Sequence, residues 1–294
     1  MRISVLIPAY NAESTLGQAV RSAIGQDTLE PFEIVICDDG SSDGTWREIQ
    51  SLADSYPQIR TLRNDGNQGI SRTRNRLLDE AHGEWIAFLD ADDAFMTNKL
   101  SACLAEAERT GADVVRHYLC YLKQEGEVTG SIRGADFLQG ALIHRDAIGS
   151  MRFSRELAAG GDSQFFCALK RRSTWTYLAE HLTAVRITRG SVTDKYWLQK
   201  RLIEHWHSKF PDRIAPHGLK VYQEFMDGLP FPVSLNLKRK WLGQRYGRMG
   251  AGLLFEGRRP TALVYLAASA VLYPSYLFSR MASNASAKRA ADVP

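Results

Sequence analysis

The chain has 294 residues, of which 44% are apolar and 24% charged, and this is ordinary for a folded, soluble protein with one large domain or one domain and an appendage. The net charge of +4 hides an asymmetry, because residues 1–194 contain 21 basic and 27 acidic residues whereas residues 195–294 contain 16 and 6. The basic C-terminal third predicts an anionic partner, either phospholipid or nucleic acid.

The four cysteines show no CxxC spacing, and Cys37 lies within an apolar run. A reduced, cytosolic compartment is the simplest interpretation of this pattern. Residues 1–8 lack the length and the cleavage site of a signal peptide, and we expect them to begin the first strand.

The first third of the chain alternates short apolar runs with segments of helical periodicity. The apolar runs predict strands at 3–7, 32–37, 59–62 and about 85–90. Helical spacing and capping residues predict helices from 14 or 15 to 24, from 45 to about 53, and from 71 to 81. Four strands that alternate with three helices predict an α/β fold with a mostly parallel, doubly wound sheet.

After Asp93 this alternation changes. The pattern predicts a helix at 97–109, a long strand at 113–122 with a partner at 128–132, a helix at 162–171, and short strands at 175–178 and 185–188. From about residue 196 the chain becomes basic and aromatic, so we expect a domain boundary near 195–215 and a basic, helical C-terminal region at 201–294.

Residues 261–278 carry no charge and are flanked by arginine and lysine on both sides. The length is borderline for a membrane span, and Ser, Thr, Pro and three Tyr dilute its apolar character. A helix that lies in the membrane interface therefore fits better than one that spans it. The alternative is a helix buried against the catalytic domain.

Three carboxylates, those of Asp90, Asp92 and Asp93, follow the fourth predicted strand. Ligands of parallel sheets bind beyond the carboxyl ends of the strands, so these side chains are expected at a ligand-binding rim. Packed anions repel one another and lose solvation, and a divalent cation such as Mg²⁺ or Mn²⁺ would offset both effects. The alternative is a polar loop in which residues 93–98 cap the next helix.

Two further segments follow predicted strands and are therefore expected at the same rim. Pro8, Ala9, Tyr10 and Asn11 come after the first strand, and the segment 38–41 (Asp-Asp-Gly-Ser) comes after the second. A nucleoside diphosphate needs an aromatic surface for its base, an acceptor for the base N–H and a cation for its phosphates. Each segment alone is a weak signal, but their joint order favours a nucleotide site.

Together these motifs resemble the inverting family 2 glycosyltransferases, which have the GT-A fold. The resemblance rests on residues 4–11, 37–43, 67–69 with Arg74 and Asn75, and 89–93, and it is strong over about 1–110 and weaker over 140–193. It implies a catalytic domain at 1–200, with a nucleotide-sugar half at 1–110 and an acceptor half at 111–200. It also implies transfer of a sugar from a nucleotide-sugar, usually a UDP-sugar.

The resemblance assigns roles by position. Tyr10 and Asp39 would hold the uracil, with Pro8 shaping the pocket, and Arg74 would lie near the nucleotide. The wider donor-binding set would be Pro8, Ala9, Tyr10, Asn11, Asp38, Asp39, Arg74, Asp90, Ala91 and Arg189. Asp90-Ala91-Asp92 would be the DxD element, with Asp92 and Asp93 as candidate ligands of Mn²⁺ or Mg²⁺.

The same resemblance makes Asp162 the general base, since Gly161-Asp162 aligns with the family's Glu-Asp pair. The Glu is missing here, which weakens the match. Asp162 also begins a predicted helix, where the dipole favours an anion, so a capping role is the alternative. Segment 186–193 resembles the loop that closes over the diphosphate, and Arg189 stands where many relatives have His; its guanidinium would offer a fixed fork to phosphate.

Several competing functions can be weighed from the sequence. A dinucleotide-dependent oxidoreductase would need G-x-G-x-x-G after the first strand, and a sugar-1-phosphate nucleotidylyltransferase a basic, glycine-rich loop there; both are absent. No motif supports nucleic-acid binding. The remaining alternative to a transferase is a non-catalytic module that binds nucleotide-sugars or glycans. The family and the basic tail together imply a lipid-linked acceptor and an enzyme bound peripherally to the cytosolic face of an anionic membrane.

Overall fold

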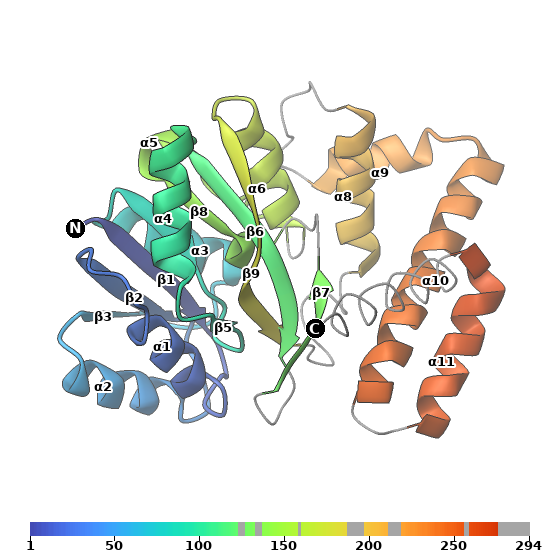
Figure 1. Ribbon diagram of the computed structural model, residues 1–294. Helices are drawn as coiled ribbons and strands as arrows, with labels where there is room; N and C mark the ends of the chain where they lie inside the picture. Colours follow the sequence, from blue (N-terminus) through green and yellow to red (C-terminus); the bar gives the residue numbers. More distant parts are fainter. Residues whose placement is uncertain are drawn as a thin grey trace, which may run out of the picture. The chain divides into compact units, whose positions relative to one another are not determined.

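A computed structural model describes residues 1–122, 127–132, 137–157, 160–186, 197–210, 219–255 and 259–275. The chain divides into two compact units. The described part of the first unit ends at Arg186, and that of the second unit begins at Trp197. Figure 1 shows the elements of both units.

The first unit begins with three βα repeats and a fourth strand, as the sequence predicts. The strands are β1 (Ile3–Ala9), β2 (Phe32–Asp38), β3 (Ile59–Arg63) and β4 (Trp85–Phe88), and the helices between them are α1 (Leu16–Ile24), α2 (Thr45–Ser55) and α3 (Ile70–Glu80). All three strand pairs in the order β3-β2-β1-β4 are parallel. The carboxyl ends of these strands therefore meet at one rim of the sheet.

Beyond β4 the sheet becomes mixed. The elements are β5 (Ala94–Phe95), α4 (Lys99–Thr110), β6 (Val114–Leu122), β7 (Val128–Ile132), a 3₁₀ turn η1 (Leu138–Gly140), β8 (Ala141–His144), α5 (Arg145–Ile148), α6 (Gly161–Lys170) and β9 (Trp175–Arg186). The full order is β3-β2-β1-β4-β8-β6-β9-β5, with β7 on β6. Strand β8 runs antiparallel to both β4 and β6, whereas β9 runs parallel to β6.

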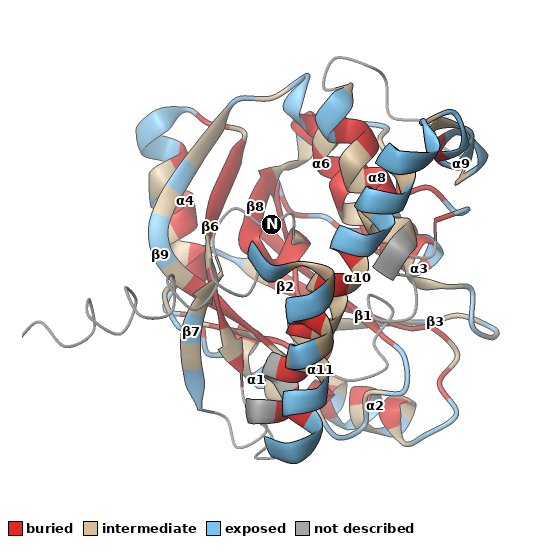
Figure 2. Cartoon of the chain, turned by 90° about the vertical axis from the view of Figure 1, so that its right-hand side faces the viewer, coloured by how far each residue is buried: buried red, intermediate tan, exposed pale blue. Residues whose placement is uncertain are grey.

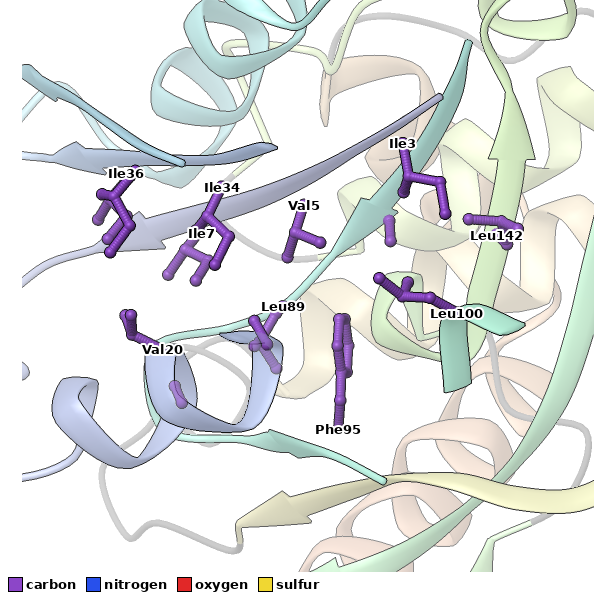
Figure 3. Close-up of a cluster of buried hydrophobic side chains, with 14 of the residues drawn as sticks. Ile3, Val5, Ile7, Val20, Ile34, Ile36, Leu89, Phe95, Leu100 and Leu142 are labelled. Carbon is purple, nitrogen blue, oxygen red and sulfur yellow. The ribbon is translucent and has the colours of Figure 1, made fainter. Parts of the chain in front are cut away.

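Helices cover both faces of this sheet. β1 is buried along its whole length (Figure 2). One core cluster joins alternate residues of β1 and β2 to α1, α2 and α4, and Figure 3 shows part of it, with Ile7 and Ile34 near Val20 and with Leu89, Phe95 and Leu100. The other cluster joins the opposite faces of these strands to α3, α5 and α6. Strands buried on both faces explain why their sequences are almost continuously apolar.

Pro8 lies inside β1, although the sequence places it at the strand's end. A proline cannot donate to a ladder, and it is tolerated where no neighbour needs its N–H. β1 pairs with β2 through Ala9, but its pairing with β4 stops at Leu6. Pro8 therefore stands where one side of β1 has already lost its partner strand.

The strands predicted at 175–178 and 185–188 are one strand in the structure. β9 runs without a break from Trp175 to Arg186, and its register with β6 shifts near His117 and Tyr118. This irregularity disturbs the apolar alternation in the middle of the strand, which is why the sequence suggests two segments. β5 and β8 are not predicted, because two and four residues are too short to show a period.

The described part of the second unit is helical. It contains α8 (Trp197–Lys209), α9 (Leu219–Asp227), α10 (Phe231–Phe255) and α11 (Arg259–Leu272), and α10 and α11 pack side by side. None of the helices in the described ranges is long and apolar enough to cross a membrane. Residues 261–272 of the uncharged stretch lie in α11, and its residues from 276 onward lie outside the described part.

Candidate active site

The segments that follow β1 and β2 are fastened together at the rim. The Asn11 backbone N–H donates to the Ser41 hydroxyl over 2.9 Å, and the Ser42 backbone N–H donates to the Asn11 side-chain oxygen over 2.9 Å. Asn11 has a positive φ of 47°, a conformation that asparagine tolerates better than most residues. Pro8 and Ala9 are buried in β1, while the Tyr10 side chain next to them is 49% exposed. The aromatic ring of Tyr10 is thus exposed at the edge of the site.

The carboxylates of Asp38 and Asp39 have different hydrogen-bond partners. Asp38 is fully buried and accepts from the backbone N–H and hydroxyl of Ser41. Its other oxygen lies 3.0 Å from Nε of Arg63, without the geometry of a hydrogen bond, so that contact is an ion pair only. Asp38 therefore shapes the turn after β2 from within.

Asp39 fastens a second loop to this turn. Its carboxylate accepts from the Asn64 side-chain amide at 2.7 Å and from the backbone N–H groups of Gln68 and Gly69 at 2.9 Å. Gly40 makes the approach possible, since a Cβ there would come within 2.5 Å of the Gly66 backbone and φ is +71°. These three donors fix the orientation of the Asp39 carboxylate beside Tyr10.

Arg74 joins the carboxylate cluster, which consists of Asp90, Asp92 and Asp93, to the start of α6. Its guanidinium donates to Asp162 at 2.7 Å and to Asp90 at 3.1 Å, and the Arg74 side chain is only 8% exposed. The guanidinium carbon lies 5.6 Å from the centre of the Phe153 ring. Asp90 and Asp162, 72 positions apart in the chain, are therefore held together by one buried cation.

Asp90 also accepts from the side-chain amide of Gln139, a buried residue of η1. The backbone oxygen of Gln139 accepts in turn from the Lys99 ammonium at 2.7 Å and from the Thr183 hydroxyl at 2.9 Å. Burial raises the pKa of Asp90 to about 6, against the opposing effect of Arg74 and with a further rise from the charges of Asp92 and Asp162. Gln139 could not be predicted from the sequence, because it directly precedes the unpredicted strand β8.

Asp93 and Asp92 meet the end of β9. Asp93 is 4% exposed and accepts from the Arg186 backbone N–H at 2.8 Å, while the Asp92 backbone oxygen accepts from Nε of Arg186 at 3.0 Å. Burial, then the charges of Asp92 and Asp90, raise the pKa of Asp93 well above its usual value. Asp92 is half-buried, so among these two it has the side chain nearer to solvent.

The carboxylates of Asp90, Asp92 and Asp93 suit a divalent cation whose remaining coordination positions a bound ligand would fill. Within the described ranges no three His, Cys, Asp or Glu side chains form a ready-made metal cage. Mg²⁺ commonly takes only one or two carboxylates and fills its other positions with water and substrate phosphates. Burial, with a further contribution from neighbouring carboxylates, raises the pKa of Asp90 and of Asp93, and a bound cation would oppose both effects.

Asp162 lies in the first turn of α6. The structure records no side-chain hydrogen bond that caps this helix, and the Asp162 carboxylate instead accepts from Arg74. Packing does not require glycine at the preceding position, since a Cβ at Gly161 would meet Phe153 at 3.7 Å and Ser71 at 3.9 Å, which are ordinary contacts. Arg189, predicted to contact the diphosphate, lies outside the described residues.

The sequence of the chain matches a protein-family model. Residues 4–178 match the model of Glycosyl transferase family 2, which is more than half of the chain. The chain belongs to glycosyltransferase family 2. The family predicted from the strand-end motifs is thereby confirmed.

The names of two curated relatives describe glucosyltransferases that act on lipid-linked sugars. One is the UDP-Glc:alpha-D-GlcNAc-diphosphoundecaprenol beta-1,3-glucosyltransferase WfaP of Escherichia coli, 42% identical over 99 residues, which are 34% of this chain and 38% of that protein. Another is the GalNAc(5)-diNAcBac-PP-undecaprenol beta-1,3-glucosyltransferase of Campylobacter jejuni, 30% identical over 156 residues, which are 53% and 50% of the two chains. The chain thus spans half or less of the length of these two relatives.

Solved structures share the fold of this family 2 chain. Staphylococcus aureus TarS (residues 1–349) in complex with UDP superposes with a TM-score of 0.58 at 16% identity, over 95% of this chain and 92% of TarS. The mannosyltransferase PcManGT from Pyrobaculum calidifontis, in complex with GDP-Man and Mn²⁺, gives 0.58 at 18% identity, over 92% and 86%. The predicted GT-A fold is confirmed.

Proposed function

We propose that this chain is an inverting glycosyltransferase that moves a sugar from a nucleotide-sugar, a UDP-sugar in the first instance, to a hydroxyl group of a lipid-linked glycan. The observation that carries the proposal is the pair of contacts from Arg74, 2.7 Å to Asp162 and 3.1 Å to Asp90. They hold the proposed base beside the carboxylates of the proposed donor site. Transfer requires this proximity, because the acceptor hydroxyl must meet the donor sugar.

The donor would bind at the ends of β1 and β2. Tyr10 would stack on the base with its exposed ring, and the Asp39 carboxylate would accept the base N–H with its remaining lone pairs. Pro8, Ala9, Asn11 and Asp38 would shape this pocket through the backbone. Bonds from three loop donors hold Asp39 in place before the donor arrives, so little ordering entropy is lost on binding.

A divalent cation, Mn²⁺ or Mg²⁺, would be held by Asp92 with help from Asp90 or Asp93, next to Ala91. When bound it would neutralise charge on the leaving diphosphate. Arg186 fixes the turn that carries these carboxylates, through its backbone and side-chain bonds to Asp93 and Asp92. Arg189 is the further cation proposed for the diphosphate.

Asp162 is the proposed general base. Inversion needs the acceptor hydroxyl to attack the anomeric carbon in line, on the side opposite the leaving diphosphate. The Asp162 carboxylate would take the hydroxyl proton, and a positioned base of this kind is typically worth about 10²–10⁴-fold in rate. The Arg74 guanidinium, 2.7 Å away, holds the Asp162 carboxylate in position at the start of α6.

The acceptor is proposed from the relatives, whose names state diphosphoundecaprenol-linked sugars. A lipid-linked acceptor implies work at a membrane surface, on the cytosolic face. The basic balance of residues 195–294 supports an anionic surface as partner.

The second candidate is a non-catalytic module that binds nucleotide-sugars or glycans. Gly161 favours it, because the family's Glu is missing although a Cβ at this position would make only ordinary contacts. Turnover separates the two functions.

The experiment incubates the protein with a panel of UDP- and GDP-sugars, Mn²⁺ and an undecaprenyl-diphosphate-linked sugar, and measures release of UDP or GDP. We expect acceptor-dependent release with one or a few donors, and its near loss in Asp162→Asn. Asp146→Asn is the matched control, because its side chain is 90% exposed and lies 3.9 Å from His144 rather than against Arg74. Donor binding without turnover in any combination would support the binding module instead.

A further inference from the structure

The outer face of α11 is apolar. Among residues 260–275 the exposed positions recur with helical spacing, and Leu263, Val264 and Val271 are 63%, 68% and 79% exposed. This α11 outer face consists of Pro260, Leu263, Val264, Ala267, Ala270, Val271 and Pro274, and the exposed polar residues in this range are Thr261 and Ser275. Figure 2 shows the exposed residues along α11. A helix that meets water would carry charged side chains at such positions.

Small residues of α11 and two glycines of α10 bring these two helices close together. Ala262 and Ser269 are fully buried, and the Ser269 hydroxyl donates to the Gly243 backbone oxygen of α10 at 2.7 Å. A Cβ at Gly243 would lie 2.6 Å from Cβ of Tyr273, and one at Gly250 would lie 2.7 Å from Leu266. The two backbones therefore approach closely at these glycines, and Leu266 and Leu272 are half-buried while Leu263, Val264 and Val271 are left outside. Large apolar side chains on the exposed face are unusual for a helix on a water-soluble protein.

The charged side chains of α10 and α11 are all basic. α10 contains five basic residues and no acidic one, and α11 begins at Arg259. Lys238, Arg239 and Lys240 are exposed, and the Lys240 ammonium lies 5.3 Å from the centre of the Tyr273 ring, next to the C-terminal end of α11. Basic groups thus stand at both ends of the α11 outer face.

We propose that the α11 outer face is a membrane-docking surface that enters the interface of an anionic bilayer, with Lys238, Lys240 and Arg259 beside the lipid phosphates. A helix of 14 residues is roughly 21 Å long, too short for a hydrocarbon core of about 30 Å, so α11 would lie in the plane of the interface. Apolar insertion and basic residues together give the two signals that stable peripheral binding needs. The proposal deepens the proposed function, because a lipid-linked acceptor would lie in the same surface.

A second copy of the chain is the other occupant to consider. Two such faces packed on each other would bring their basic ends together, and neither α10 nor α11 offers an acidic residue to pair with them. Like charges at an interface disfavour the contact. Anionic lipid supplies the missing negative charge and the apolar layer at once.

The test is co-sedimentation of the full chain with phosphatidylcholine vesicles that contain or lack phosphatidylglycerol, at low and high salt. We expect binding to the anionic vesicles at low salt and weaker binding in the other conditions. Val264→Asp/Val271→Asp should lower the partition coefficient about tenfold or more, because two exposed apolar contacts become charged. Leu29→Asp/Tyr177→Asp is the matched control in the first unit, since both side chains are exposed, and it should bind like the unchanged protein.

The charge contribution is tested separately. Lys238→Gln/Lys240→Gln should weaken binding to anionic vesicles, whereas Lys209→Gln/Lys220→Gln, which loses the same charge from exposed sites on α8 and α9, should weaken it less. Circular dichroism establishes that each variant is folded, and UDP affinity in the absence of vesicles should be unchanged in all of them.

Full-length protein that stays in the supernatant with anionic vesicles at low salt would overturn the proposal, as would equal binding by Val264→Asp/Val271→Asp. A dimer in light scattering that this double variant disrupts would assign the face to a second copy. A chain that binds vesicles but releases no UDP or GDP would contradict the proposed function and leave the docking surface standing, so the two failures are distinguishable.

Discussion

Replacement of Arg74 by methionine tests the centre of the site. The change keeps a long, flexible side chain but removes the cation that stands 2.7 Å from Asp162 and 3.1 Å from Asp90. Breaking a buried ion pair by removing one partner costs about 3–5 kcal/mol, because it leaves an uncompensated charge. With two carboxylates left behind, we expect Arg74→Met to lose about 3–5 kcal/mol of unfolding free energy at pH 8.

This loss should depend on pH. Without Arg74 the pKa of the Asp90 carboxyl rises above its present value of about 6, since the cation now lowers it. A folded-state pKa above the unfolded one means that the folded variant binds more protons, so its stability falls as pH rises through that range. The difference from the unchanged protein should therefore be smaller at pH 5 than at pH 8.

The assay is urea unfolding followed by tryptophan fluorescence at both pH values, with EDTA present. Arg76→Met is the matched control on the same helix, because Arg76 donates at 2.7 Å to two neutral groups, the Arg63 backbone oxygen and the Asn64 side-chain oxygen. It should cost about 1–2 kcal/mol with little dependence on pH. If Arg74→Met and Arg76→Met lose the same free energy at both pH values, Arg74 does not hold the two carboxylates together.

Three further changes separate chemistry, metal binding and stability. Asp162→Asn should leave UDP-sugar affinity nearly intact while it lowers kcat by about 10²-fold or more, and a near-normal kcat would reduce Asp162 to a residue that stabilises the helix start. Asp92→Asn should weaken cation-dependent UDP binding in calorimetry, and this prediction fails if UDP affinity is the same with and without EDTA. Burial lowers the pKa of Lys99 to about 7 from 10.5, so the unfolded chain binds more protons between these values and the unchanged protein should gain stability with rising pH by at most about 1.4 kcal/mol per unit. Lys99→Met should lack this slope in urea unfolding with EDTA, and an unaltered slope would show that another group produces it.

The sequence predicts the first half of the fold because the information there is local. Each apolar run is long enough to identify a strand, and each strand is followed by its polar motif, so Tyr10, Asp39 and Asp90 can be assigned to one rim from strand order alone. The parallel order needs no more than the rule that βαβ units cross over with one hand. The donor-binding and metal-binding roles of these residues stay predictions.

The partners of those residues could not be predicted, because they come from distant parts of the chain. Gln139 is 49 positions from Asp90 and precedes a four-residue strand without a visible period. Arg186 is 93 positions from Asp93 and lies at the end of a strand whose register with β6 is irregular. The resemblance places Arg74 near the nucleotide, which stays a prediction, and its contacts with Asp90 and Asp162 are what the structure adds.

The charges of the site explain why the donor and a cation would bind together. The Asp90 and Asp162 carboxylates both accept from the Arg74 guanidinium, and the Asp93 carboxylate accepts from the backbone N–H of Arg186, whose guanidinium donates to the Asp92 backbone oxygen. Burial raises the pKa of both Asp90 and Asp93, and the charges of neighbouring carboxylates raise it further, so the ionised forms are disfavoured at this site. A diphosphate would add more negative charge to the same place. A divalent cation removes this repulsion and lets the carboxylates ionise, so cation affinity and donor affinity should each increase the other.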